Sequence, residues 1–147
     1  MNVLVIHGPN LNLLGTREPQ TYGTQTLVDI DARIVHEAAL LGVGVHCVQY
    51  NSEGAIVDAL HAARGAVDAI VINPGAFTHY AYAIRDAIAA IGIPAVEVHL
   101  TNTSAREEFR RTSVVAGVCV GTIAGFGIES YALALRAVAG ATARSAN

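Results

Sequence analysis

The sequence predicts an α/β fold, in which a doubly wound parallel sheet of five strands carries helices on both faces. Two observations lead to this prediction. Five short apolar runs of strand type alternate with stretches of helical periodicity, and such alternation requires parallel strands joined by right-handed crossovers. The chain has 147 residues and contains no internal repeat, linker or low-complexity tract. We therefore expect a single domain over residues 1–147.

The strands are predicted where apolar residues cluster in short runs. These runs span residues 2–7, 43–50, 69–73, 95–99 and 114–122. Because helical stretches separate them, the pattern predicts a strand followed by a helix, repeated five times.

The helices are predicted from apolar residues at helical spacing and from residues that cap helix ends. The first is expected to follow Thr26 as N-cap and to stop at Gly42, since threonine accepts a backbone N–H and glycine adopts the left-handed conformation. The second is expected from about Ser52 to Gly65. Further helices are predicted over residues 78–92, 104–110 and 128–138.

Five strands joined in this way take the spatial order 2-1-3-4-5, the flavodoxin-like arrangement. The ligand crevice of such a sheet lies beyond the carboxyl ends of the strands, where strands 1 and 3 meet and strand 4 follows. Three chemically functional segments lie at these ends: His7-Gly8-Pro9-Asn10, Asn73-Pro74-Gly75-Ala76-Phe77-Thr78-His79 and Glu97-Val98-His99. Their convergence predicts an active site.

Glu97 and His99 are the most informative pair. Alternation along a strand puts both side chains on the same face, so the carboxylate can stabilise the imidazolium. The pair is a proton donor backed by a carboxylate.

The connection after the first strand, residues 11–24, is longer than such loops usually are. We interpret it as an active-site lid. Within it, a bend at Pro19 could bring Arg17 and Tyr22 together over the crevice. An unperturbed phenol, with a pKa of about 10, is a poor base at neutral pH, and an adjacent guanidinium favours the tyrosinate. An ordinary loop ion pair beside a packed tyrosine is the alternative.

Composition limits the classes of function. All nine basic residues are arginine, which excludes a lysine Schiff base and a P-loop lysine. The net charge of −3 and the absence of a basic tract argue against nucleic-acid and membrane partners. With 52% hydrophobic residues, the chain is expected to bury apolar surface in a homo-oligomer. Without a signal peptide or a spanning segment, we expect it in the cytoplasm.

Two other functions remain open at this point. A binding module could hold a flavin or a phosphate in the same crevice, but Pro9-Asn10-Leu11-Asn12-Leu13-Leu14 offers few donors for a phosphate. A metal hydrolase could use His7, His79, His99 and Glu97, although no HExxH-type spacing supports a metal site.

Taken together, the segments resemble the type II 3-dehydroquinate dehydratases along essentially the whole chain. In chain order, the matching segments are His7-Gly8-Pro9-Asn10-Leu11, Arg17-Glu18-Pro19 with Tyr22-Gly23, Asn73-Pro74-Gly75-Ala76 with Thr78-His79, Ile84-Arg85-Asp86-Ala87, Glu97-Val98-His99, Arg106-Glu107-Glu108-Phe109-Arg110 and Tyr131-Ala132-Leu133-Ala134-Leu135. The sequence departs from the family's frequent residues at Ser104 and Phe77, which bear on fine substrate contacts.

The resemblance implies a lyase that dehydrates 3-dehydroquinate to 3-dehydroshikimate without a cofactor or a metal. It implies anti elimination through an enolate, in the shikimate pathway of aromatic amino acid biosynthesis or in quinate catabolism. Tyr22 would be the base, kept as tyrosinate by Arg17. Asn10 would bind the enolate oxygen, and His99, backed by Glu97, would protonate the departing hydroxyl.

The resemblance also implies the substrate contacts and the assembly. The substrate carboxylate would bind Asn73 and the backbone N–H groups of Leu100 and Thr101, while His79 and Arg110 would hold ring hydroxyls. Asp86 would reach a neighbouring subunit's site, because the family forms dodecamers, each a tetramer of trimers.

Overall fold

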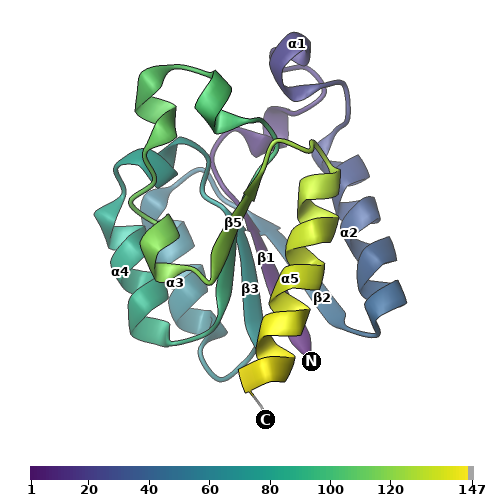
Figure 1. Ribbon diagram of the computed structural model, residues 1–147, viewed down its shortest axis with the longest axis vertical. Coiled ribbons are helices and arrows are strands. Elements are labelled where there is room, and N and C mark those ends of the chain that lie inside the picture. The colour runs from purple at the N-terminus through teal and green to yellow at the C-terminus, as the bar shows by residue number, and fades with distance from the viewer. Residues whose placement is uncertain (146–147) are drawn as a thin grey trace.

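The computed structural model describes residues 1–145 and confirms the predicted parallel sheet, with the strand order β2-β1-β3-β4-β5 (Figure 1). All four strand pairs are parallel. The strands are β1 (Asn2–His7), β2 (Gly44–Gln49), β3 (Ala69–Asn73), β4 (Ala95–His99) and β5 (Gly121–Ala124). The α-helices are α1 (Pro19–Tyr22), α2 (Leu27–Leu41), α3 (Glu53–Ala63), α4 (Tyr82–Ile91) and α5 (Glu129–Ser145).

The helices form one layer on each side of the sheet. Helices α2 and α5 cover one face, and α3 and α4 cover the other (Figure 1). Alternate residues of a strand therefore enter different cores: Val3 and Val5 pack on the α2 and α5 side, whereas Leu4 and Ile6 pack on the α3 and α4 side. The central strands β1, β3 and β4 are buried on both faces, as the near-continuous apolar runs require.

The predicted caps define the first two long helices. Thr26 and Asp29 form a reciprocal capping box at the start of α2, and Gly42 ends it in the left-handed conformation with φ of 68°. Ser52 caps α3 through the Ala55 N–H. Helix α3 ends at Ala63, two residues before the predicted glycine.

The helix predicted over residues 78–92 begins later, at Tyr82. A separate 3-10 helix, η2 (Gly75–His79), comes before it. Because η2 turns Thr78 inward, that threonine is buried at the end of the sheet. The last helix is longer than predicted and continues to Ser145.

The prediction of a strand over residues 114–122 was wrong in its position. The first part of that run forms a 3-10 turn, η5 (Ala116–Val118), and β5 begins at Gly121. The Ser113 hydroxyl accepts the N–H groups of Val115 and Ala116 and so starts the turn. Val115 is fully buried against the α3 and α4 side, so its apolar character reflects packing of a turn.

The single short helix predicted over residues 104–110 is also corrected. Two 3-10 helices occupy this region, η3 (Thr103–Ala105) and η4 (Glu108–Arg111). Between them, Arg106 is extended, with φ of −107° and ψ of −159°. This break directs the Arg106 side chain to the lid instead of along a helix face.

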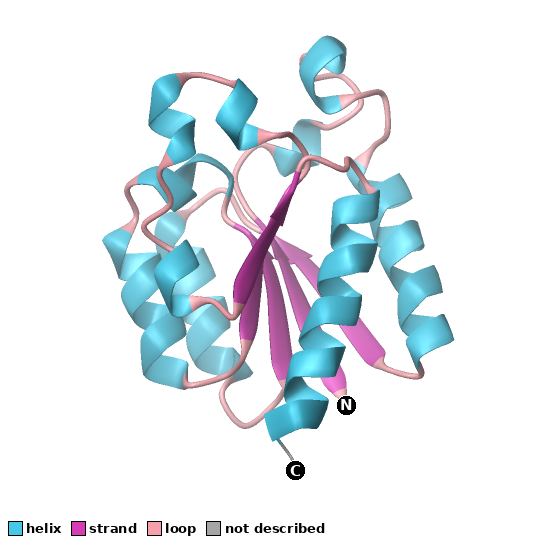
Figure 2. Cartoon of the chain, viewed as in Figure 1, coloured by secondary structure: helices cyan, strands magenta, loops and turns pink. Residues whose placement is uncertain are grey.

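Residues 11–24 hold a further 3-10 helix, η1 (Leu11–Leu13), and the short helix α1. Figure 2 shows α1 and the η3 and η4 region beyond the end of the sheet to which the strand arrows point. Among residues 1–145, no helix has the length and apolar character needed to span a bilayer.

Candidate active site

A cavity lies beyond the carboxyl ends of β1, β3 and β4, where the sequence predicted a crevice. Nine of the predicted site residues line it: Asn10, Arg17, Tyr22, Asn73, His79, His99, Leu100, Thr101 and Arg110. Arg106 and Thr103, which were not predicted as site residues, line it as well. Segments far apart in the sequence therefore line a single cavity that carries many polar side chains.

The turn after β1 brings Asn10 to the cavity. Gly8 packs so closely on β3 that a Cβ atom would lie 2.7 Å from the Asn73 carbonyl oxygen, which only glycine avoids. Asn10 itself adopts the left-handed conformation, with φ of 69°, a region that asparagine tolerates better than most residues. Its backbone N–H donates to the Asn51 side chain at 3.0 Å.

The lid places Tyr22 in contact with two guanidinium groups, those of Arg17 and Arg106. Pro19 starts α1 after Glu18, and the resulting bend puts the Arg17 guanidinium carbon 4.4 Å from the centre of the Tyr22 ring. Arg106 donates a hydrogen bond to the Tyr22 hydroxyl oxygen at 2.9 Å. Arg106 falls within the helix predicted over residues 104–110 and has no predicted role in the site. Its place in the Arg106-Glu107-Glu108-Phe109-Arg110 segment was the signal that could have identified it.

The predicted Glu97 and His99 pair is present at the end of β4. Glu97 Oε1 and His99 Nε2 are 2.7 Å apart, and both side chains lie on the α3 and α4 side of the sheet. His99 lines the cavity, whereas Glu97 lies behind it and is fully buried.

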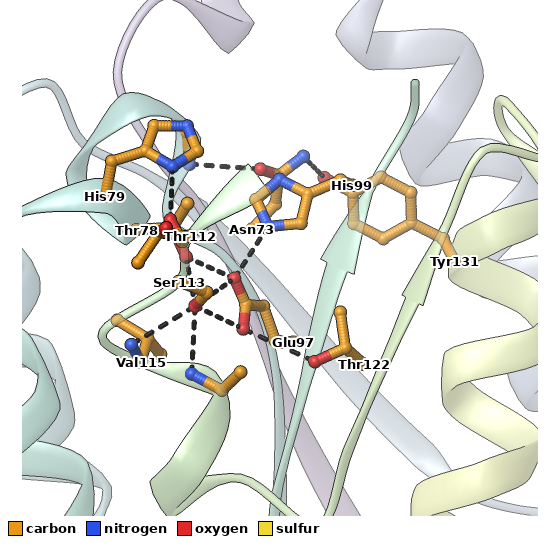
Figure 3. A network of polar contacts seen from close by, with 12 residues as sticks. Asn73, Thr78, His79, Glu97, His99, Thr112, Ser113, Val115, Thr122 and Tyr131 are labelled. Atoms are coloured by element: carbon orange, nitrogen blue, oxygen red, sulfur yellow. Dashed lines mark hydrogen bonds and ion pairs between the residues drawn. The ribbon is translucent and has the colours of Figure 1, made fainter. Parts of the chain in front are cut away.

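A set of hydroxyl groups surrounds the Glu97 carboxylate (Figure 3). Ser113 and Thr78 donate to it, with Ser113 Oγ 2.9 Å from Oε2, and Thr122 lies at 3.4 Å. Because the Ser113 oxygen accepts two backbone N–H groups, its own proton is free for the carboxylate. Burial favours the neutral acid, but hydrogen bonds from His99, Thr78 and Ser113 outweigh it and lower the pKa of the Glu97 carboxyl. Glu97 is therefore a buried, ionised group.

Polar side chains on other elements complete the cavity wall. The Asn73 Oδ1 atom accepts the Gly75 N–H at 3.1 Å. His79 Nδ1 lies 2.7 Å from the Thr112 carbonyl oxygen, so Nδ1 carries a proton that it donates there. Arg110 pairs with Glu107 and lies over the Phe109 ring. These contacts fix the orientation of the three side chains that face the cavity.

Asp86 is a predicted site residue that lies outside this arrangement. Its side chain is 74% exposed on α4 and pairs with Arg85 at 3.0 Å. It does not line the cavity of its own chain.

His7 does not face the cavity either. It is buried and bonded to Asp31 and Tyr131. The ligand set considered for a metal hydrolase, His7, His79, His99 and Glu97, is therefore not assembled. Among residues 1–145, the group whose potential ligand atoms lie within 4.8 Å of one another is His7, Asp31 and Cys47.

Comparisons with known proteins agree with this geometry. A family model described as "Dehydroquinase class II" matches residues 1–139. The 3-dehydroquinate dehydratase of Desulforudis audaxviator is 61% identical over 137 residues, which cover 93% of this chain and 91% of that protein. The 3-dehydroquinate dehydratase of Pelotomaculum thermopropionicum is 57% identical over 139 residues, with 95% and 96% covered.

Solved structures show the same fold. The type II dehydroquinase from Butyrivibrio crossotus superposes with a TM-score of 0.92 at 46% identity, over 94% of this chain and 97% of that one. A 3-dehydroquinate dehydratase-like protein from Bifidobacterium longum superposes less well, with a TM-score of 0.71 at 33% identity, over 95% and 96% of the two chains.

Proposed function

Because the chain belongs to the class II dehydroquinases, we propose that its cavity dehydrates 3-dehydroquinate to 3-dehydroshikimate, with Tyr22 as base and His99 as acid. The protein is thus a hydro-lyase. One observation supports these roles above all others: a phenol in contact with two guanidinium groups and an imidazole backed by a buried carboxylate line the same cavity.

The first step removes a proton from the carbon next to the substrate ketone. The Tyr22 oxygen takes this proton, and the electron pair of the broken C–H bond moves into the ketone to form an enolate. Two nearby cations, Arg17 and Arg106, stabilise the tyrosinate form that the step requires. Asn10 donates to the enolate oxygen, directly or through water, and one such donor is worth about 3 kcal/mol.

The second step breaks the bond between carbon and the leaving hydroxyl. The enolate electrons form the new C=C bond, and His99 gives its proton to the departing oxygen, which leaves as water. Ionised Glu97, 2.7 Å from His99 Nε2, stabilises the imidazolium that acts as acid. Tyr22 then releases its proton to solvent and His99 takes one up, which restores both groups for the next cycle. The elimination is anti.

The substrate is held by groups that need no lysine. Its carboxylate binds Asn73 and the backbone N–H groups of Leu100 and Thr101, while His79 and Arg110 bind ring hydroxyls. Residues 11–24 act as the lid of the single domain, and its closure excludes water from the enolate. No cofactor or metal takes part in these steps.

The proposal extends to the oligomeric state of the protein. The exposed position of Asp86 on α4 suits a contact with a neighbouring subunit's site, and large apolar side chains such as Val28, Leu40, Tyr82 and Phe126 remain exposed. We propose a dodecamer, a tetramer of trimers, which light scattering would detect. A monomer with full activity would rule out a role for Asp86 across subunits.

The enzyme serves the shikimate pathway or quinate catabolism in the cytoplasm. Both routes use the same reaction, so the site alone favours neither. The neighbouring genes would distinguish them.

The assay adds 3-dehydroquinate to purified protein treated with a chelator and follows the ultraviolet absorbance of the conjugated enone. We expect a rapid rise, unaffected by borohydride pretreatment because the chain has no lysine. In Tyr22→Phe we expect kcat to fall by orders of magnitude with the fold retained, whereas Tyr50→Phe serves as the matched control. The Tyr50 hydroxyl has no hydrogen-bond partner among residues 1–145 and lies outside the cavity. Full activity of folded Tyr22→Phe would falsify the assignment of the base.

A further inference from the structure

A second polar network lies on the opposite face of the sheet from Glu97. His7 and Asn73 are direct partners in the pairing of β1 with β3, and strand alternation turns both toward α2 and α5. There the Tyr131 hydroxyl lies 2.9 Å from His7 Nδ1 and 3.1 Å from Asn73 Nδ2. On the far side of the imidazole, His7 Nε2 lies 2.8 Å from Asp31 Oδ1. The network thus runs from a partly exposed carboxylate to the cavity wall.

Counting protons along this network leaves one consistent arrangement. The Gly75 N–H donates to Asn73 Oδ1, so the amide presents Nδ2 to Tyr131, and the Tyr131 oxygen accepts. The single Tyr131 proton then goes to His7 Nδ1. Consequently His7 carries its proton on Nε2 and donates it to Asp31, which as a carboxylate only accepts.

The side chains at the centre of this network, Tyr131 and the nearby Cys47, carry no charge. Tyr131 is 1% exposed, and burial raises its pKa, so its hydroxyl keeps the proton. Cys47 lies beside His7 and Asp31. Burial, and next the Asp31 carboxylate, raise the pKa of the Cys47 thiol to about 12, so it adds no negative charge.

We infer that Tyr131, oriented by the His7 and Asp31 pair, is a positioning residue that sets the orientation of the Asn73 amide in the substrate pocket. The inference rests on the proposed function, in which Asn73 binds the substrate carboxylate. The Asn73 nitrogen has two protons. One is donated to Tyr131. The second has no acceptor among residues 1–145, which leaves it for a ligand in the cavity that Asn73 lines.

The opposite amide orientation is unfavourable because of both neighbours. A flipped Asn73 would place its nitrogen against the Gly75 N–H and its oxygen against Tyr131. The Tyr131 proton would then have to turn from His7 to Asn73, which leaves His7 Nδ1 without a donor in a buried site. The carboxylate of Asp31 therefore acts on the amide of Asn73 through two intervening residues, His7 and Tyr131, and three hydrogen bonds.

The test is a double-mutant cycle on steady-state kinetics with 3-dehydroquinate. Tyr131→Phe removes the acceptor for Asn73 while keeping the ring, and we expect KM to rise about tenfold with kcat changed by less than about threefold, since carboxylate binding is shared by ground and transition states. In the Asn73→Ala background, Tyr131→Phe should have no further effect on KM. A merely structural role for Tyr131 would persist in that background. Tyr50→Phe, at a half-buried tyrosine outside both networks, should leave both constants unchanged.

Asp31→Asn provides a second route that preserves folding, because this side chain is 39% exposed. An asparagine at position 31 can face either imidazole tautomer, so the amide of Asn73 is less firmly held, and we expect KM to rise about threefold. Asp58→Asn is its control, because Asp58 is exposed on α3 and its carboxylate has no hydrogen-bond partner among residues 1–145.

The outcomes separate this inference from the proposed function. If the wild type does not dehydrate 3-dehydroquinate, the function is wrong and the inference is overturned with it. If Asn73→Ala raises KM but Tyr131→Phe and Asp31→Asn do not, the inference alone is overturned. If Tyr131→Phe does not fold, the KM of Asp31→Asn decides the question, and an unchanged value contradicts the inference.

Discussion

The two faces of the sheet carry polar networks of different character at the same edge. On the α3 and α4 side, ionised Glu97 faces His99 and accepts hydrogen bonds from several hydroxyl groups. On the α2 and α5 side, Tyr131 joins neutral partners, and the carboxylate of Asp31 lies at the outer end. The buried charge is thus on the side where the proposed mechanism moves a proton, and the neutral chain is on the side where the proposal requires an amide to stay in place.

The difference shows how the two faces of one sheet edge can carry separate tasks, proton transfer on one face and substrate positioning on the other. A fully buried carboxylate is costly unless several donors compensate it, and Glu97 has four side-chain contacts that do so. Asn73 needs no charge, because its task in the proposal is to present an amide proton. Variants on the first side should therefore change kcat, and variants on the second should change KM.

The largest effect is expected for His99→Asn. Loss of the general acid should lower kcat by about 10²- to 10⁴-fold, with a much smaller change in KM. His36→Asn is the control, since the His36 side chain is exposed on α2 and has no hydrogen-bond partner among residues 1–145. A kcat close to that of the wild type in folded His99→Asn would remove the acid from the mechanism.

Glu97→Gln should have the next largest effect. The amide keeps the shape but cannot stabilise the imidazolium, so we expect kcat to fall about 10- to 100-fold. Circular dichroism and oligomer mass would check that the fold is kept. An unchanged kcat would mean that the buried carboxylate serves only stability.

Ser113→Ala should have a smaller effect on kcat, about three- to tenfold. Its hydroxyl helps keep Glu97 ionised and so acts on His99 indirectly. Ser113→Thr retains the hydroxyl and should recover most of the activity. Equal loss in both variants would point to packing around η5 as the cause.

The smallest effect concerns stability and pH. Folding lowers the pKa of the Glu97 carboxyl from its ordinary value of 4.5. Ionised Glu97 therefore contributes stability that is fully present above pH 4.5 and is lost as pH falls through the lower, folded-state pKa. The Tm of the wild type should exceed that of Glu97→Gln by a few degrees at pH 7, and the gap should shrink as pH falls below 4.5.

Glu53→Gln is the matched control for this measurement. The Glu53 carboxylate has no side-chain hydrogen-bond partner among residues 1–145. Its Tm difference from the wild type should be small at all pH values. A gap for Glu97→Gln that widens on acidification would contradict the ionised state.

The sequence predicted one of these networks much better than the other. Glu97 and His99 belong to one strand, so a period of two was enough to bring them together. The other network joins residues that are 24 and 124 positions apart from His7, and no local pattern encodes such contacts. Strand order and the caps at Thr26, Gly42 and Ser52 follow from local rules.

Two local predictions failed for reasons of packing. The apolar run at 114–122 looked like a strand, but its first half is buried as a turn that Ser113 starts. Arg106 lies in the run predicted as one helix over residues 104–110, but its backbone is extended between two 3-10 helices and its side chain contacts Tyr22. In both cases a tertiary contact overrides a local pattern.

The most direct test of this account is to measure kcat and KM for Glu97→Gln and Tyr131→Phe side by side in the same assay. The account predicts a fall in kcat for Glu97→Gln, with KM nearly constant. For Tyr131→Phe it predicts a rise in KM, with kcat nearly constant. If both variants changed the same constant to the same extent, the two faces of the sheet would not divide the work as proposed.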